Sequence, residues 1–219
     1  MIKCCIFDLD GTILDTITTI TYFVNATVER YGVRPITEEE CKYFAGNGAR
    51  LLITRTLESR GIFDKELLEK ILKEYNAAYD ADPLYLTSPF EKIKDMLASL
   101  KERGVKLAVL SNKPDPTVKS IVKSFFPETF DIVLGGREGV PLKPDPFVPR
   151  EILASFGESE ENTAWIGDTA TDVETGKNLG ARMNIGVLWG FRKKEELVGA
   201  GASRVVSTVD ELREAISVG

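Results

Sequence analysis

Short runs of almost continuous apolar residues alternate with amphipathic helical patterns along the later part of this chain. Residues 105–110 and 163–166 are two such runs, and each is followed by a polar turn and then a helical pattern. Strands that are apolar on both faces are typical of parallel sheets that helices cover on both sides. The pattern therefore predicts an α/β fold with a doubly wound, Rossmann-like parallel sheet core.

Residues at the ends of these patterns set the expected element boundaries. Ser88 and Pro89 are typical of the N-cap and first-turn proline of a helix, which Gly104 would end. Asp172 is expected to cap a later helix that stops around Gly180. The expected strands are residues 2–7, 105–110, 130–134, 163–166, 184–188 and 204–207, and further helices are expected over residues 116–125 and 209–217.

Residues 15–82 carry helical patterns and no convincing strand. Asp15 or Thr16 can cap the first helix, and Thr37 begins a capping box with Glu40. Because this stretch interrupts the chain after only one strand, we interpret it as an inserted unit. The predicted division is a core of residues 1–14 and 84–219 and an all-helical cap domain of residues 15–83.

The composition excludes several kinds of chemistry and partner. The 219 residues carry a net charge of −6, which argues against a general nucleic-acid binder. No apolar run approaches the ~20 residues needed to cross a bilayer. The chain contains no histidine, so acid–base work must use Asp, Glu, Lys, Tyr or Cys. The chain opens without a signal-peptide pattern, and we expect a cytoplasmic protein whose Cys4, Cys5 and Cys41 are reduced packing residues.

Polar side chains stand at the ends of the predicted strands. Asp8 and Asp10 follow the first strand two residues apart, so in an extended segment their side chains leave on the same side. In doubly wound sheets, ligands bind at the carboxyl ends of the strands. Each polar residue alone could be a helix cap, a turn or a solvated charge, but together they predict one site. The other members are Ser111, Asn112, Lys113, Lys143, Asp168 and Asp172.

These residue types suit phosphoryl chemistry. Three or four carboxylates in one crevice are suited to an octahedral Mg²⁺ site. A hydroxyl, an ammonium and Mg²⁺ match the non-bridging oxygens of a phosphoryl group. One carboxylate can attack phosphorus to form an aspartyl-phosphate, while a second gives and takes the proton.

The motifs in order resemble those of the haloacid dehalogenase superfamily of phosphatases, in members that carry a helical cap after the first motif. Residues 8–12 match the D-x-D-G-T motif, Ser111 the second motif and Lys143 the third. Residues 167–172 match the fourth motif, G-D-x-x-x-D. The resemblance covers nearly the whole chain, and it implies a phosphoric monoester hydrolase.

The resemblance also implies a role for each residue. Asp8 would be the nucleophile, Asp10 the general acid and base, and Lys143 the catalytic cation that neutralises Asp8 and the phosphoryl charge. Thr12, Ser111, Asn112 and Lys143 would bind the phosphoryl group. The Mg²⁺ ligands would be Asp8, Asp10 through its backbone carbonyl, Asp168 and Asp172.

Softer features are similar to phosphoglycolate phosphatases within that superfamily. They are the Ser111-Asn112-Lys113 run, the Gly46-Asn47-Gly48 turn and the segment from Trp189 to Arg192. The backbone N–H groups of the turn and the Arg50 cation behind it could meet a substrate carboxylate, so Gly46, Asn47, Gly48 and Arg50 are the candidate specificity residues of the cap. Arg192, Lys193 and Lys194 are expected to be a solvated helix start.

The predicted function is therefore Mg²⁺-dependent hydrolysis of small phosphate monoesters, with phosphoglycolate as the leading substrate. The expected partner is a small-molecule phosphate ester, with no nucleic acid and no membrane, and the protein is expected to be a monomer or homodimer. Alternatives are a sugar-phosphate phosphatase or a phosphomutase of the same superfamily. A receiver domain is disfavoured because receivers are shorter, lack a cap and place the lysine last, whereas Lys143 precedes Asp168 and Asp172.

Overall fold

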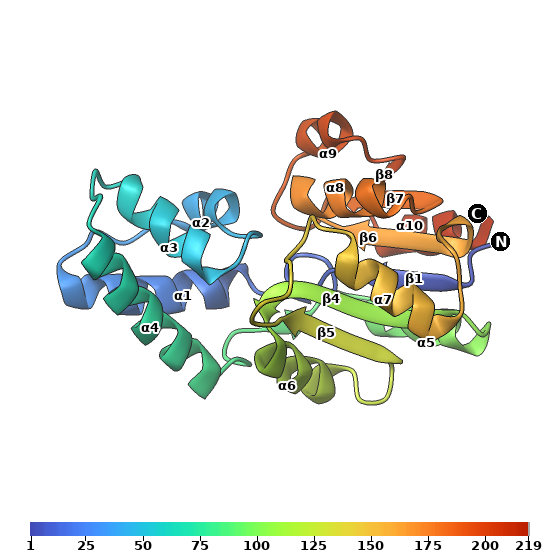
Figure 1. Cartoon of the computed structure of the whole chain (residues 1–219), viewed down its shortest axis with the longest axis horizontal. Coiled ribbons are helices and arrows are strands. Elements are labelled where there is room, and N and C mark those ends of the chain that lie inside the picture. Colours follow the sequence, from blue (N-terminus) through green and yellow to red (C-terminus); the bar gives the residue numbers. More distant parts are fainter. Residues whose placement is uncertain (219) are drawn as a thin grey trace. The chain divides into compact units, whose positions relative to one another are not determined.

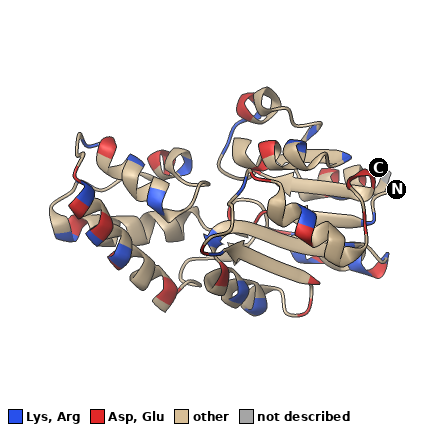
Figure 2. Ribbon diagram, in the orientation of Figure 1, with Lys and Arg blue, Asp and Glu red and all other residues tan. Residues whose placement is uncertain are grey.

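The structure, a computed structural model, describes residues 1–218 and divides into two compact units. The core unit is Met1–Asp15 with Pro89–Gly219, and the helical unit is Thr16–Ser88. Lys and Arg are interspersed with Asp and Glu on the helices of both units (Figure 2). Within the described residues, no helix combines the length and the apolar character that crossing a membrane requires.

The core unit is built on a six-stranded sheet with the order β5-β4-β1-β6-β7-β8, in which every pair is parallel (Figure 1). Its strands are β1 (Cys4–Phe7), β4 (Lys106–Pro114), β5 (Ile132–Gly136), β6 (Thr163–Gly167), β7 (Met183–Val187) and β8 (Arg204–Val206). Numbered among themselves, these strands run 3-2-1-4-5-6, the order of the Rossmann fold. This confirms the predicted fold class and puts the topological switch point between β1 and β6.

Helices cover both faces of this sheet (Figure 1). They are α5 (Ile93–Glu102), α6 (Asp115–Phe125), α7 (Phe147–Phe156), α8 (Ala170–Leu179), α9 (Lys194–Ala200) and α10 (Val209–Val218). The central strand β1 is buried on both sides: Cys4 and Ile6 pack in a cluster with Ile152 of α7, and Phe7 meets the ring of Phe130 edge-on. Alternation along a strand sends its side chains to opposite faces, so an apolar residue is needed at each position.

The helical unit contains α1 (Ile17–Val28), a 3₁₀ turn (Glu29–Tyr31), α2 (Glu38–Phe44), α3 (Ala49–Glu58) and α4 (Lys65–Ala81). The predicted capping box is confirmed, because Thr37 Oγ1 accepts from the Glu40 N–H and the Glu40 carboxylate accepts from the Thr37 N–H. Thr16 occupies the N-cap position of α1 but its hydroxyl caps nothing, so neither it nor Asp15 has the predicted capping role by a side-chain bond.

The prediction of a helix start at Ser88 and Pro89 was wrong. These residues form β3 (Ser88–Pro89), which pairs with β2 (Leu14–Asp15) where the chain passes between units. Proline lacks an N–H donor, so it is tolerated at the edge of so short a pair. Helix α5 begins only at Ile93, after Lys92 adopts a left-handed backbone conformation.

Two further element boundaries differ from the predicted ones, and both involve residues of the candidate site. Strand β4 continues beyond residue 110 to Pro114, with a register shift against β5, so Ser111 and Lys113 lie in irregular strand rather than in a loop. Asp172 is not the N-cap of α8: Thr169 is, and Asp172 is its third helical residue in a capping box. Both predictions relied on local residue preferences that fit either position.

Candidate active site

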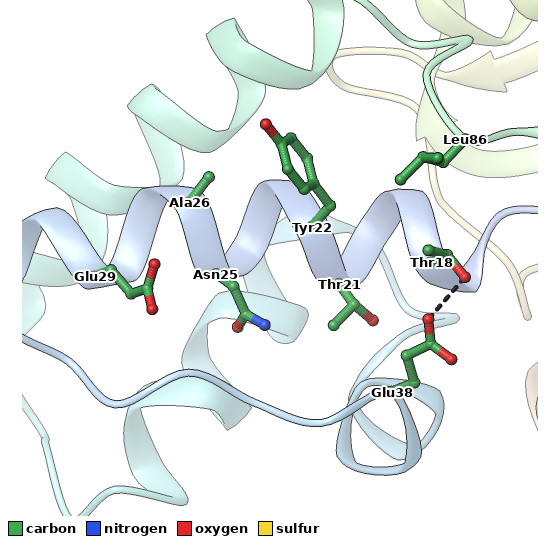
Figure 3. A pocket seen from close by; sticks show the side chains of 8 residues that line it. All are labelled: Thr18, Thr21, Tyr22, Asn25, Ala26, Glu29, Glu38 and Leu86. Carbon is green, nitrogen blue, oxygen red and sulfur yellow. Dashed lines mark hydrogen bonds between the residues drawn. The ribbon is translucent and has the colours of Figure 1, made fainter.

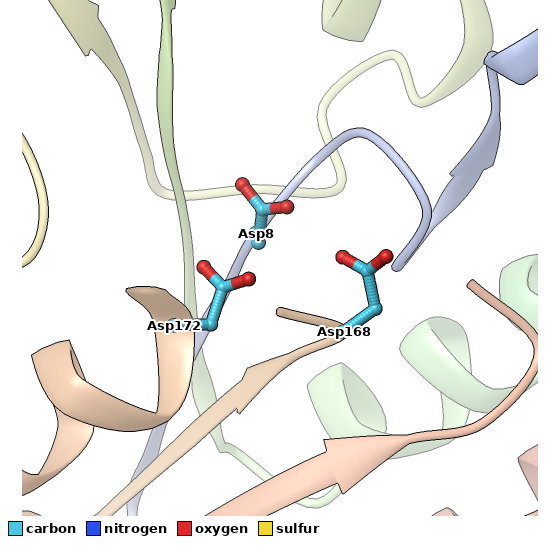
Figure 4. Close-up of side chains that lie close together, drawn as sticks. All are labelled: Asp8, Asp168 and Asp172. Carbon is cyan, nitrogen blue, oxygen red and sulfur yellow. The ribbon is translucent and has the colours of Figure 1, made fainter. Parts of the chain in front are cut away.

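Three carboxylates meet at the carboxyl edge of the sheet, at the switch point (Figure 4). Asp8 follows β1, Asp168 follows β6 and Asp172 lies in the first turn of α8. One oxygen of each lies within 4.8 Å of the others, and all three residues are buried. Burying three like charges together is unfavourable unless cations compensate them.

Lys143 is the cation that the structure places among them. Its Nζ donates to Asp8 Oδ1 at 2.5 Å and to Asp172 Oδ1 at 2.7 Å. The ammonium lies 5.9 Å from the centre of the Trp165 ring, at the outer range of a cation–π contact. The Lys143 side chain is 3% exposed, so its charge interacts with these carboxylates rather than with water.

Burial and mutual repulsion control protonation in this cluster. Burial, followed by the charge of Asp172, raises the pKa of Asp8 to about 7, although Lys143 acts in the opposite direction. Burial and then Asp172 likewise raise the pKa of Asp168 well above its ordinary value. Burial lowers the pKa of Lys143, but Asp172 and Asp8 outweigh it and the net pKa is raised. The lysine therefore stays charged, while Asp8 and Asp168 hold their protons more tightly than ordinary carboxyl groups do.

Asp168 sits in a cradle formed by two distant segments. Its Oδ1 accepts from the Thr12 hydroxyl at 3.2 Å, and its Oδ2 accepts from the Phe191 N–H at 2.7 Å. Trp189 ties the segments together, because its Nε1 donates to the Thr12 carbonyl at 3.0 Å. A Cβ on Gly190 would lie 2.3 Å from Asp168 Oδ2, so only glycine fits there. The carboxylate is thus held at both oxygens.

Asp172 and Asn112 fix the position of Lys143 and the edge of the site. Asp172 Oδ2 accepts from the Thr169 N–H at 3.0 Å and hydroxyl at 2.6 Å, which leaves Oδ1 for the lysine. The Asn112 amide accepts from the Lys143 N–H at 2.9 Å and donates to the Lys143 carbonyl at 3.2 Å. Asn112 thereby anchors the backbone from which the ammonium projects.

Asp10 lies outside the triad and is paired with another lysine. Lys113 Nζ donates to Asp10 Oδ1 at 2.9 Å, and both side chains are largely buried. Ser111 is buried, and its Oγ accepts from the Lys113 N–H at 3.2 Å. The sequence singled out Lys113 as a neighbour of Ser111 but did not connect it with Asp10, because a residue inside the irregular end of a strand has no predictable direction.

The predicted solvated role of Arg192 was wrong. Its side chain is 7% exposed, its Nε donates to Glu196 Oε1 at 3.0 Å, and its charge lowers the pKa of Asp168 against the larger effect of burial. A run of three basic residues is usually solvated, so only the path of the chain past Asp168 could have revealed this burial.

The candidate specificity residues lie in the helical unit, where other side chains bind two of them, Asn47 and Arg50. The two outer nitrogens of Arg50 donate to the two carboxylate oxygens of Glu69, at 2.5 and 2.9 Å. Asn47 accepts from Arg55, which also donates to the Phe44 carbonyl. Arg55 therefore braces the turn of residues 46–48, a role that its sequence position did not indicate.

The helical unit also has a cavity of about 300 Å³ beside α1 (Figure 3). Thr18 donates to Glu38 at 2.7 Å at one end of it, and Tyr22 and Glu29 line it further along. Its lining carries two glutamates and no lysine or arginine, so it is unsuited to a phosphate group. The acid cluster of the core unit is the better candidate for chemistry on a phosphate.

The donor set of the core site fits a hard divalent cation. Its three buried carboxylates face one ammonium, and burial together with their mutual repulsion raises the pKa of Asp8 and Asp168. Oxygen ligands are those that Mg²⁺ and Ca²⁺ prefer. Buried carboxylates that could hold a cation, beside a lysine at the switch point of a doubly wound sheet, fit an α/β enzyme that acts on an anionic substrate.

Comparison with known proteins agrees with this class. The family model for haloacid dehalogenase-like hydrolases matches residues 5–185, and the chain belongs to that family. A phosphoglycolate phosphatase of Aquifex aeolicus is 32% identical over 86% of this chain and 85% of its own length. One from Rhodospirillum rubrum is 30% identical over 94% of this chain and 87% of its own. The chain is thus a hydrolase, and the predicted superfamily is confirmed.

Solved structures give the same result. A protein from Lactobacillus delbrueckii, provisionally named a phosphoglycolate phosphatase, superposes with a TM-score of 0.92 and is 34% identical, with 98% of both chains covered. A protein from Thermotoga maritima, provisionally named a β-phosphoglucomutase, has a TM-score of 0.74 at 23% identity over 99% of both chains. The second likeness concerns the fold alone.

The close packing around Asp168 predicts that a methyl group added at residue 190 strongly affects metal binding and stability. Gly190→Ala should place its Cβ against Asp168 Oδ2 and the Gly11 carbonyl, which are both held by the backbone. We expect a loss of most of the Mg²⁺-induced rise in Tm and a fall in stability of about 1–3 kcal/mol. Gly199→Ala is the matched control, because a Cβ there meets no atom within 4 Å. Equal Mg²⁺ responses in the two variants would contradict the cradle.

The raised pKa of Asp8 predicts how stability depends on pH without added metal. The folded protein holds this proton up to about pH 7, whereas the unfolded chain releases it near 3.8, so the free energy of unfolding should fall as pH rises through that window. Asp168 acts in the same direction. Thermal unfolding in chelator should therefore give a lower Tm at about pH 8 than at about pH 5, with a larger Mg²⁺-induced rise at the higher pH. In Asp8→Asn, Tm should fall less between about pH 5 and about pH 8. A wild-type Tm that rises over this pH range in chelator would refute the raised pKa of Asp8.

Proposed function

We propose that this protein is a Mg²⁺-dependent phosphatase that hydrolyses small phosphate monoesters through an aspartyl-phosphate on Asp8. The observation that carries the proposal is the position of Lys143, whose ammonium joins Asp8 to Asp172 inside a buried acid cluster. A lysine in this place favours ionised Asp8 and presents positive charge where a phosphoryl group would arrive.

In the first step, an oxygen of Asp8 attacks phosphorus and the bond from phosphorus to the ester oxygen breaks. Asp10, two residues further along the chain, gives its proton to the departing oxygen. The alcohol leaves, and Asp8 carries the phosphoryl group as a mixed anhydride. Lys143 and the N–H groups and hydroxyls around Ser111 would hold the phosphoryl oxygens.

In the second step, water attacks the same phosphorus and Asp10 takes its proton. The bond between phosphorus and the Asp8 oxygen breaks, which releases inorganic phosphate and restores the carboxylate. The thiols cannot replace Asp8, since Cys4, Cys5 and Cys41 are buried and burial raises the pKa of each, most strongly for Cys5 and Cys41.

The metal ligands that we propose are Asp8, Asp168 and the backbone carbonyl of Asp10, with Asp172 in support. Asp172 is the least available of the carboxylates, because Lys143 and Thr169 already occupy its oxygens. When bound, Mg²⁺ would offset the charge of the carboxylates and of the phosphoryl oxygens. Thr12 donates to Asp168 rather than pointing away from it, so we propose that it orients the metal ligand as well as lying near the phosphoryl group.

Phosphoglycolate is the substrate that we propose first, because relatives of that name reach 32% identity over most of the chain. A phosphomutase shares the same fold at 23% identity, and no feature of this site favours it. Release of inorganic phosphate from phosphoglycolate and from sugar phosphates, measured beside isomerisation of the latter, separates the two functions. A cytoplasmic location and a monomeric or homodimeric state complete the proposal.

The two aspartates should differ in their effects on turnover. Asp8→Asn removes the nucleophile and should leave no measurable phosphate release, while Asp10→Asn should slow hydrolysis by about 10²- to 10⁴-fold. Steady-state assays of phosphoglycolate with Mg²⁺ measure both, and circular dichroism verifies the folds. Turnover of Asp8→Asn near the wild-type rate would end the covalent mechanism.

We propose that the helical unit acts as a cap that selects the substrate through Gly46, Asn47, Gly48 and Arg50. If Arg50 meets a substrate carboxylate, Arg50→Ala should raise KM for phosphoglycolate by about 10-fold and leave p-nitrophenyl phosphate unchanged. Glu69→Gln is the matched variant, because it weakens the pair that occupies Arg50 and should lower that KM. An equal change for both substrates would reject the specificity role.

A further inference from the structure

The Lys113–Asp10 ion pair is a contact of the site that the proposed chemistry has not used. Lys113 Nζ lies 2.9 Å from Asp10 Oδ1, and the two side chains are 11% and 17% exposed. A charge pair so poorly exposed is screened little by water, so it orients its partners more strongly than a surface pair does.

The backbone that carries Lys113 is held on several sides. The register of β4 against β5 shifts between Leu110 and Pro114, and the Lys113 N–H donates to Ser111 Oγ at 3.2 Å. Gly135 of β5 packs so closely that a Cβ there would lie 2.6 Å from the Lys113 carbonyl oxygen. An irregular strand end of this kind re-aims a side chain, and here it aims Lys113 at Asp10.

We propose that Lys113 is a positioning residue that holds the Asp10 carboxyl group in the direction needed for proton transfer. The inference rests on the proposed role of Asp10 as general acid and base. Proton transfer requires the carboxyl group within hydrogen-bond reach of the ester oxygen, and a misplaced group loses much of its contribution. Lys113 fixes one oxygen of Asp10 and leaves the other for the substrate.

The other reading of Lys113 is that it binds the carboxylate of an acidic substrate directly. The two readings predict different substrate dependence. A carboxylate-binding lysine matters only for substrates with a carboxylate. In kcat/KM, which reflects only the steps up to formation of the aspartyl-phosphate, a lysine that acts through Asp10 matters for every ester whose leaving oxygen must gain a proton, and hardly at all for p-nitrophenyl phosphate, whose leaving group needs none.

The experiment compares kcat/KM of Lys113→Met and wild type on three Mg²⁺-dependent reactions. The substrates are phosphoglycolate, 2-hydroxyethyl phosphate, which has a hydroxyl in place of the carboxylate, and p-nitrophenyl phosphate. We expect a loss of about 10- to 100-fold on both alkyl esters and of less than about 3-fold on the aryl ester. Adding Lys113→Met to Asp10→Asn should cause no further loss on the alkyl esters, since the two changes remove the same function. Lys119→Met is the control, because the Lys119 side chain on α6 is 54% exposed and pairs with Asp115 rather than with Asp10, so its loss should change all three rates by less than about 2-fold.

A loss confined to phosphoglycolate, or an equal loss on all three substrates, would overturn the positioning role. If Lys113→Met does not fold, Lys113→Gln retains a donor and most of the side chain, and the same ratio between alkyl and aryl esters decides the question. An Asp10→Asn variant with no preference between alkyl and aryl esters would instead overturn the proposed function itself.

Discussion

The contact between Lys143 and the carboxylates of Asp8 and Asp172 is the interaction on which the site depends. Three acids buried together would repel one another, and their charge could not be sustained in the interior without a compensating cation. Lys143 supplies one positive charge at 2.5 and 2.7 Å, with Asn112 anchoring its backbone and Thr169 orienting Asp172. The repulsion that one lysine leaves uncompensated adds to burial in raising the pKa of Asp8 and Asp168, and a cation bound to these carboxylates would relieve it.

The parallel sheet explains how residues so far apart in the sequence reach this contact. Asp8 and Asp168 follow adjacent strands on the two sides of the switch point, where loops of opposite direction leave the sheet edge open. Lys143 arrives from the segment before α7, and the Trp189–Arg192 segment closes around Asp168 from the far side. Each group is placed by a short connection to a buried strand or helix, which gives the site the rigidity that charge stabilisation requires.

The fold and the members of the acid cluster followed from periodicity and motif, because continuous apolar strands and carboxylates at their ends have few alternative explanations. The sequence could not indicate in which direction individual side chains point or how deeply they are buried. Lys113 and Ser111 lie in a strand end whose register shifts, Asp172 occupies the third position of its helix rather than the cap, and Arg192 is buried although it begins a basic run. Ser88 and Pro89 read locally as a helix start, yet pairing with Leu14 and Asp15 prevails. In each case a tertiary contact, which no local sequence pattern shows, determines the observed conformation.

The central claim is that Asp8 carries the phosphoryl group during turnover. Its most direct test is to quench the enzyme during hydrolysis of phosphoglycolate with Mg²⁺, reduce it with borohydride, and map the product by peptide mass spectrometry. An aspartyl-phosphate is reduced to homoserine, whereas a free carboxylate is not. The account predicts homoserine at position 8, dependent on substrate and absent from Asp8→Asn. Homoserine at another aspartate, or turnover with no trapped residue at position 8, would contradict it.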